Sequence, residues 1–236
     1  MRRGMVCLPL LLVFFGGSLP GESALQDPYI PDGEWMVLSV REDENESVMR
    51  GTVDIQGEQG ELYAVTTSSD REEIRLIMDR GSMATISVRT VRSMAGYRIV
   101  SSTEVQGSPA LGRDEIRMLD TTGLVYALRG YPFNDPRELR ITFLSSDNDD
   151  DSNFELSVDL SGKETMTVAG RRIECYRLEM SFEMSGVFSV FTRLVPRTKL
   201  WYSVAPPHYM VRYQGQNGPP GTPMTVMEIM NYSGWK

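Results

Sequence analysis

The sequence predicts a mainly β protein: a single curved antiparallel sheet that forms an unclosed β-barrel, with one or two short helices capping it. Three observations predict this fold. Apolar and polar residues alternate in segment after segment, turn-forming residues separate most of these segments, and only one stretch in the middle of the chain has helical spacing. About a dozen short strands at such intervals are typical of a meandering sheet that curls on itself.

The clearest alternation runs from residue 174 to residue 184 and predicts a strand with one apolar and one polar face. Its apolar face holds Tyr176, Leu178, Met180, Phe182 and Met184. The same pattern predicts strands at 35–40, 52–55, 62–67, 74–78, 84–89, 97–104, 139–144, 154–160, 165–168, 187–194, 199–204, 209–213 and 225–232. Turns are predicted at 56–57, 79–81, 161–162, 169–170 and 218–223.

The stretch from 113 to 128 departs from this alternation and predicts a helix. Its apolar residues recur at close to helical spacing, and Asp114 and Glu115 stand where a helix start favours negative charge. Residues 120–122 offer capping side chains for a second, shorter helix at 123–129. We expect these helical segments to cap one opening of the curved sheet.

The first 24 residues have the pattern of a cleavable export signal. Arg2 and Arg3 precede an apolar run at 6–15, which is too short for the roughly 20 apolar residues that span a bilayer. Small residues follow, and the cleavage site is left open between Ser18 and Leu25. We expect a signal peptide at 1–24, a single domain at 25–236 without a transmembrane span, and a location in the periplasm or cell envelope of a Gram-negative bacterium.

Charge and cysteine content exclude several kinds of partner. The formal net charge of −8 argues against nucleic acid and anionic lipid surfaces, because both favour clustered Lys and Arg. Cys7 lies in the predicted signal, so Cys175 has no partner for an internal disulfide. We expect Cys175 to be a small buried hydrophobe, with a reactive or intermolecular thiol as the alternative.

No motif in the chain predicts catalysis or a metal site. The acidic run at 147–153 fails the calcium-loop pattern, because Ser152 stands at position six, where glycine is required, and Val158 at position twelve, where glutamate is required. His208 is the single histidine, and a turn or loop role is the simpler interpretation than a triad base or zinc ligand. The sequence also lacks a nucleophile elbow and a phosphate-binding glycine loop.

Paired carboxylates are the remaining route to an enzyme, since glycosidase chemistry uses two acids about 5–10 Å apart. Asp54 with Glu61 and Glu179 with Glu183 are nominal candidates, but alternation places them on polar strand faces. We therefore expect no enzyme, no catalytic residue, no metal and no cofactor.

Methionine is frequent, with 15 residues in the chain, and Met224, Met227 and Met230 lie three apart. Copper(I) carriers bind through such thioethers. On a strand, however, a spacing of three turns Met227 away from the other two. The methionines are better interpreted as core filler or as an adaptable lining for a cavity that accepts varied apolar shapes.

The run DTTGLVYALRGYPF, several shorter motifs of the later half and one motif near the start of the chain resemble a bacterial exported family called domain of unknown function 3108. The run from Asp120 to Phe133, DTTGLVYALRGYPF, resembles its Asp-x-x-Ser-x-x-Tyr-x-Leu-Arg signature, although Gly123 replaces the usual Ser or Leu. The other matching segments are Gly33-Glu34-Trp35, Gly162-Lys163-Glu164, Val168-Ala169-Gly170, Glu174-Cys175-Tyr176, Lys199-Leu200-Trp201-Tyr202-Ser203 and Pro206-Pro207-His208-Tyr209-Met210-Val211.

The resemblance implies a curved, unclosed β-barrel exported to the cell envelope, similar in outline to the Lol lipoprotein carriers. Those carriers hold acyl chains against an apolar concave face capped by short helices. The resemblance carries over no catalytic residue. Its recurring residues are equally open to a structural role: Asp120, Tyr126, Arg129, Gly170 and Trp201.

Two functions remain open on the sequence. The first is a non-catalytic periplasmic protein that binds a lipid, a lipoprotein acyl chain or another apolar ligand in a hollow lined by Trp35, Tyr126, Tyr176, Met180, Phe182 and Trp201. The alternative is an envelope protein-interaction module with a filled interior, whose protein partner docks on an edge strand or on the acidic surface. A hollow of several hundred Å³ favours the first function, and a packed interior favours the second.

Overall fold

The computed structural model describes residues 23–94, 97–104, 110–112, 115–118, 121–143, 154–183, 196–216 and 222–235. In this part of the chain fourteen strands form one sheet. The strands are β1 (Glu34–Glu42), β2 (Asn45–Gln56), β3 (Leu62–Ser68), β4 (Glu72–Asp79), β5 (Thr85–Met94), β6 (Tyr97–Glu104), β7 (Ala110–Gly112), β8 (Glu115–Met118), β9 (Leu139–Phe143), β10 (Phe154–Val168), β11 (Arg171–Glu183), β12 (Thr198–Ser203), β13 (Met210–Gln216) and β14 (Met224–Tyr232).

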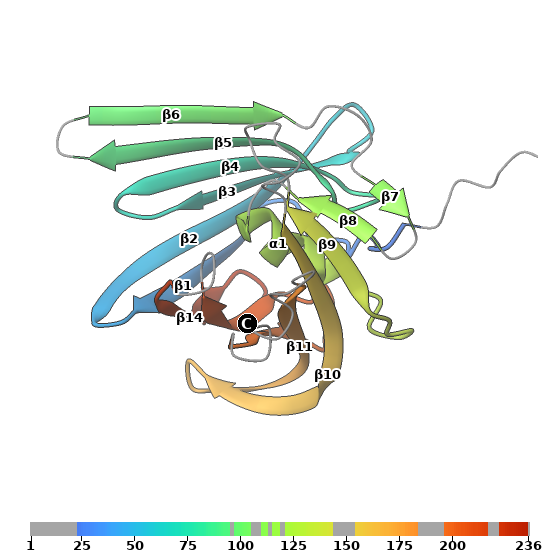
Figure 1. The fold of residues 1–236 in the computed structure, drawn as a ribbon. Coiled ribbons are helices and arrows are strands. Elements are labelled where there is room, and N and C mark those ends of the chain that lie inside the picture. The colour runs from blue at the N-terminus through green and yellow to red at the C-terminus, as the bar shows by residue number, and fades with distance from the viewer. Residues whose placement is uncertain are drawn as a thin grey trace, which may run out of the picture.

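The sheet curls around the helical segment without closing (Figure 1). Its strand order is β6-β5-β4-β3-β2-β1-β14-β13-β12-β11-β10-β9-β8-β7, so the strands of both halves of the chain meet where β1 pairs with β14. Neighbours are antiparallel except β8 and β9, which are parallel. The predicted fold class, a mainly β, curved and unclosed sheet, is confirmed.

The structure joins two predicted strands into one. Residues 154–160 and 165–168 both belong to β10, and the turn predicted at 161–162 is wrong. The register between β10 and β11 shifts between Leu160 and Gly162, and Gly162 has a φ of 146°. This is a β-bulge, which bends a long strand where glycine relieves the backbone. The predicted turn at 169–170 is confirmed as the connection between β10 and β11.

The helix predicted at 113–128 is wrong in its first part. Glu115–Met118 is strand β8, and the helical residues are α1 (Thr121–Ala127) followed by the 3₁₀ helix η1 (Leu128–Gly130). Ile116 and Met118 are both buried, which is the spacing of two that a strand requires. The shorter predicted helix at 123–129 matches α1 and η1 closely, so two short helical pieces are present.

Several predictions lie outside the described residues. They are the export signal as far as residue 22, the acidic run at 147–153, the strand at 187–194, Asp120 and most of the turn at 218–223. Ala24, the last residue of the predicted signal segment, is buried in the core together with Leu25.

The segment before β1 closes one end of the curved sheet. Leu25 and Ile30 are buried, and the backbone N–H of Gln26 donates to Gly130 O of η1 at 2.9 Å. The hydroxyl of Tyr63 donates to the carboxylate of Asp27, which also forms an ion pair with Arg80 at 2.9 Å. These contacts attach the segment to strand β3 and to the helical cap.

We expect the fold to lose stability in alkaline solution through Tyr63. Burial, together with the hydrogen bond to Asp27, raises the pKa of Tyr63 from 10.0 to about 12. Because the folded protein holds this proton more tightly than the unfolded chain, the contribution to stability is complete below pH 10 and is lost as pH rises towards 12. Urea unfolding at several pH values measures this slope. In a Tyr63→Phe variant the slope should be shallower, and an unchanged slope would contradict the assignment.

Candidate functional site

The concave face of the sheet encloses a cavity of about 410 Å³. Its walls come from strands on both sides of the β1–β14 pair: β1 to β5 on one side, and β9 to β14 on the other. Helix α1 contributes Thr122, Leu124, Val125 and Tyr126. The cavity therefore lies between the curled sheet and the helix, where both halves of the chain contribute to it.

The apolar part of the cavity is rich in methionine. Its lining includes five methionines from five different strands: Met36, Met49, Met180, Met210 and Met227. Leucine, isoleucine and phenylalanine side chains complete this part, among them Leu38, Ile74, Phe143, Leu156 and Leu200. Unbranched thioethers adapt to differently shaped apolar neighbours, so this lining suits a ligand without fixed polar groups.

Four polar residues of the lining, Ser47, Ser69, Glu72 and Arg92, lie near one end of the neighbouring strands β2 to β5. Ser47, Ser69 and Arg92 are exposed, which shows that the cavity opens to solvent there. Arg92 forms an ion pair with Glu72, which stands directly opposite it across β4 and β5, at 2.5 Å between Nε and Oε1. The cavity thus has a mainly apolar lining and a charged, hydroxyl-bearing mouth.

A buried ion pair holds the helical cap against the sheet. Arg129 of η1 donates from Nη1 and Nη2 to the two carboxylate oxygens of Glu34 on β1, at 2.5 and 2.9 Å. Both side chains are 1% exposed. Tyr232 of β14 donates to Glu34 at 2.7 Å, and Arg129 Nε donates to Pro207 O at 3.1 Å. Both charges belong to motifs that the resemblance had singled out, and in this structure their contact holds η1 against β1.

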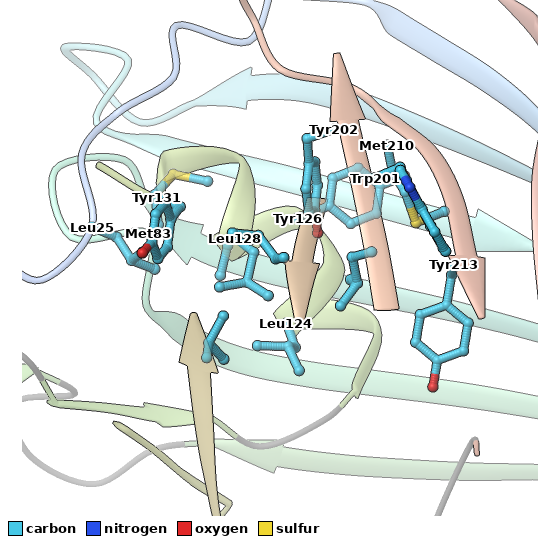
Figure 2. Packing of buried hydrophobic residues seen from close by; sticks show 14 of the residues in the cluster. Leu25, Met83, Leu124, Tyr126, Leu128, Tyr131, Trp201, Tyr202, Met210 and Tyr213 are labelled. Atoms are coloured by element: carbon cyan, nitrogen blue, oxygen red, sulfur yellow. The ribbon is translucent and has the colours of Figure 1, made fainter. Parts of the chain in front are cut away.

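Tyr126 of α1 packs against β2, and Tyr202 of β12 forms a hydrogen bond to α1. The hydroxyl of Tyr202 donates to Val125 O at 2.8 Å, and burial raises the pKa of both tyrosines. The hydroxyl oxygen of Tyr126 lies 2.2 Å from where a Cβ at Gly51 would be, so only glycine lets β2 approach the ring this closely. Figure 2 shows Leu124, Tyr126 and Leu128 of the helical segment among the buried side chains of the strands.

The structure places the predicted lining residues in different surroundings. Tyr126 and Met180 line the cavity. Tyr176 lies on the concave face beyond it, where its ring stacks on Phe133 at 4.2 Å between centroids. The side chain of Phe182 lies outside the described residues, although its backbone belongs to β11.

The two tryptophans that were predicted to line the hollow, Trp35 and Trp201, lie on the outer face of the sheet. Trp35 alternates with the cavity residues Met36 and Leu38, and the guanidinium of Arg50 lies 5.5 Å from its ring. Trp201 alternates with Leu200 in the same way, and its indole N–H donates to Glu164. Neither tryptophan therefore contributes to the cavity.

His208 and Cys175 are both held by contacts within the fold. His208 follows Pro206-Pro207 in a turn, its Nδ1 lies 2.9 Å from Ser203 O, and burial lowers its pKa. Cys175 is fully buried, as expected, and burial raises the pKa of its thiol to about 12. A thiol that remains protonated and buried does not act as a nucleophile at neutral pH.

Few metal-binding or titratable groups lie in and around the cavity. No three His, Cys, Asp or Glu side chains among them are grouped so as to hold a metal ion. Glu72 is the one carboxylate among the described residues of the cavity lining. Asp54 and Glu179, from the nominal carboxylate pairs, alternate with inward-facing residues and so lie on the outer face.

Met227 lines the cavity, whereas Met224 and Met230 on the same strand are exposed. The predicted separation of Met227 from the other two is therefore confirmed. A shared thioether site of these three methionines is excluded by their placement on β14.

Comparison with known proteins finds likeness in structure and none in sequence. No protein-family model matches the chain, so the resemblance to domain of unknown function 3108 rests on the quoted residues alone. No curated protein matches it either.

Three solved structures illustrate the structural likeness. A β-barrel-like protein of domain of unknown function 1849 from Brucella abortus is 9% identical, with a TM-score of 0.47 over 85% of this chain and 97% of that one. The hypothetical lipoprotein YmcC from Escherichia coli is 14% identical, with a TM-score of 0.35 over 87% and 92%. A complex of MucA and MucB from Pseudomonas aeruginosa contains a chain that is 11% identical, with a TM-score of 0.38 over 90% and 56%.

These likenesses concern the path of the backbone and give no information about a ligand or partner of this protein. In the described ranges no helix has the length and apolar content that a membrane span needs.

Proposed function

We propose that this chain is a non-catalytic protein of the bacterial cell envelope that binds an apolar ligand, such as a lipid or a lipoprotein acyl chain, in the concave cavity. The observation that supports the proposal most is the cavity of about 410 Å³ with its apolar lining. Ligand pockets are typically about 300–1,000 Å³, whereas an interaction module with a filled interior requires packed side chains here. The export-signal pattern supports the envelope location.

The distribution of polarity favours an amphiphile over a wholly apolar molecule. The five methionines and their aliphatic neighbours offer a surface from which a hydrocarbon chain excludes water, at about 25 cal/mol for each Å² of apolar surface buried. Arg92, Glu72 and the two serines at the mouth leave a polar headgroup in contact with solvent and with charged partners. The hydrocarbon chain would therefore lie against α1, with the polar end towards Arg92.

The absence of catalysis is part of the proposal. Hydrolysis of a glycoside requires two convergent carboxylates, and acyl transfer requires a nucleophile with a base. Among the described residues, Glu72 is paired with Arg92, and His208 faces Phe133 with its ring centroid 4.9 Å away. Neither supplies a reacting pair in the cavity.

The test uses protein purified from the periplasm of an expressing Gram-negative host. Native mass spectrometry should show a bound mass that organic solvent removes, and the extracted protein should bind one Nile red molecule that palmitate displaces. Protein that carries no extractable ligand and binds neither Nile red nor palmitate would contradict the proposal.

A further inference from the structure

Among the described residues nothing pairs with the outer edge of strand β6, and its side chains are exposed on both faces of the sheet. It is the last strand on its side of the sheet order, and Figure 1 shows it at the outer edge. Tyr97, Ile99 and Val100 are 78%, 56% and 51% exposed, with Val100 on the face opposite to the other two. A strand edge with exposed apolar side chains is a template for a further strand.

Geometry restricts how two copies of β6 can pair. Antiparallel copies that continue one sheet are related by a two-fold axis perpendicular to it, so opposing residues must face the same side. Residues on one side of a strand are an even number of positions apart, and the backbone groups that point to the free edge alternate with the same period. The residue numbers of two opposing residues must therefore add up to an even number, which means that the two-fold axis passes through a residue of β6.

One of these registers brings opposite charges together. With the two-fold axis at Ser101, Arg98 of each copy stands opposite Glu104 of the other, and both side chains are exposed in the single chain. An axis at Val100 places Arg98 opposite Ser102 instead, and an axis at Ser102 places Glu104 opposite Val100. Directly opposed charges of unlike sign stabilise an antiparallel pair, so the register at Ser101 is favoured.

We propose that β6 pairs with β6 of a second copy of this chain, which continues the sheet across a two-fold axis at Ser101. Ile99 then stands opposite Thr103, and Val100 opposite Ser102, so the apolar side chains gain neighbours on both faces. Among the described residues β6 pairs with β5 alone, and the second copy gives it a hydrogen-bonded neighbour on its other edge. The dimer is independent of any ligand in the cavity.

The test is sedimentation equilibrium of the wild-type chain and of charge variants at the edge. Arg98→Glu and Glu104→Arg each place two like-charge pairs across the axis, and each variant alone should self-associate at least tenfold more weakly than wild type. An equimolar mixture of the two variants restores an unlike pair at both positions and should form a heterodimer about as tight as the wild-type dimer. The double variant R98E/E104R should also regain the wild-type affinity.

A matched control makes the same charge change inside the sheet. Arg75→Glu on β4 alters an exposed arginine away from the edge and should leave the dimer unchanged. Circular dichroism verifies that every variant is folded. A monomeric wild type, a dimer that the single variants leave as tight as before, or single variants that do not associate on mixing would each overturn the proposal.

Discussion

Replacing Arg129 by methionine should lower the free energy of unfolding by about 3–5 kcal/mol, because it leaves the carboxylate of Glu34 buried without its counter-charge. A domain of this size has a total stability of about 5–15 kcal/mol, so the loss is a large share of it. The pair also connects η1 to β1 and, through Tyr232, to β14. Urea unfolding followed by circular dichroism measures the change.

Two controls separate the buried ion pair from ion pairs in general. In the Arg92→Met control, Glu72 loses an ion-pair partner that lies at the same N–O distance of 2.5 Å. Because Arg92 is 62% exposed, the free energy of unfolding should fall by no more than about 1 kcal/mol. The double variant R129M/E34L removes both buried charges and should recover more than half of the loss caused by R129M alone. A loss under about 1 kcal/mol for R129M would contradict the role of the pair.

Replacing Met227 by tryptophan should weaken the binding of Nile red or palmitate at least tenfold. Met227 lines the cavity from β14, opposite Val40 of β1, which is also a lining residue. The larger indole would occupy space that the proposed ligand needs. Fluorescence titration of delipidated protein measures the affinity.

The matched control lies three residues further along the same strand. Met230 is 49% exposed and does not line the cavity, so Met230→Trp should bind as wild type does. Met49→Trp on β2 fills the cavity from another strand and should repeat the effect of Met227→Trp. Equal affinities for Met227→Trp and Met230→Trp in folded protein would show that the ligand binds elsewhere.

The sequence predicts the strands well because alternation is a local property. Most predicted strands coincide with observed ones, and β11 and β14 are the clearest cases. The bulge at Gly162 and the short strand β8 were missed for a physical reason. A Ser-Gly pair serves a turn or a bulge equally well, and four residues are too few to distinguish a period of two from a helical period.

The cavity lining is harder to predict, because alternation separates two faces without saying which one is concave. Trp35 in β1 and Trp201 in β12 were predicted to line the hollow. Each strand also carries apolar residues on its opposite face, and these residues face inwards: Met36 and Leu38 in β1, and Leu200 and Tyr202 in β12. On the outer face, Trp201 is covered by two charged side chains. Its indole N–H donates to Glu164, and the guanidinium of Arg212 lies 5.7 Å from its ring. Counting the apolar residues on each face would have favoured the correct side.

Long-range pairs leave no local signal at all. Glu34 and Arg129 are 95 residues apart in sequence, and only the strand order brings β1 beside the helical cap. Both charges belong to motifs that the resemblance singled out, which indicated that they matter but not that they meet. Their contact requires the fold.

The most direct measurement of the binding role is a high-resolution crystal structure of the protein purified from the envelope of its native host. The proposed function predicts elongated density between α1 and the methionines of the cavity, with its polar end near Arg92. A cavity that holds only ordered water, or that closes because its side chains pack together, would contradict it.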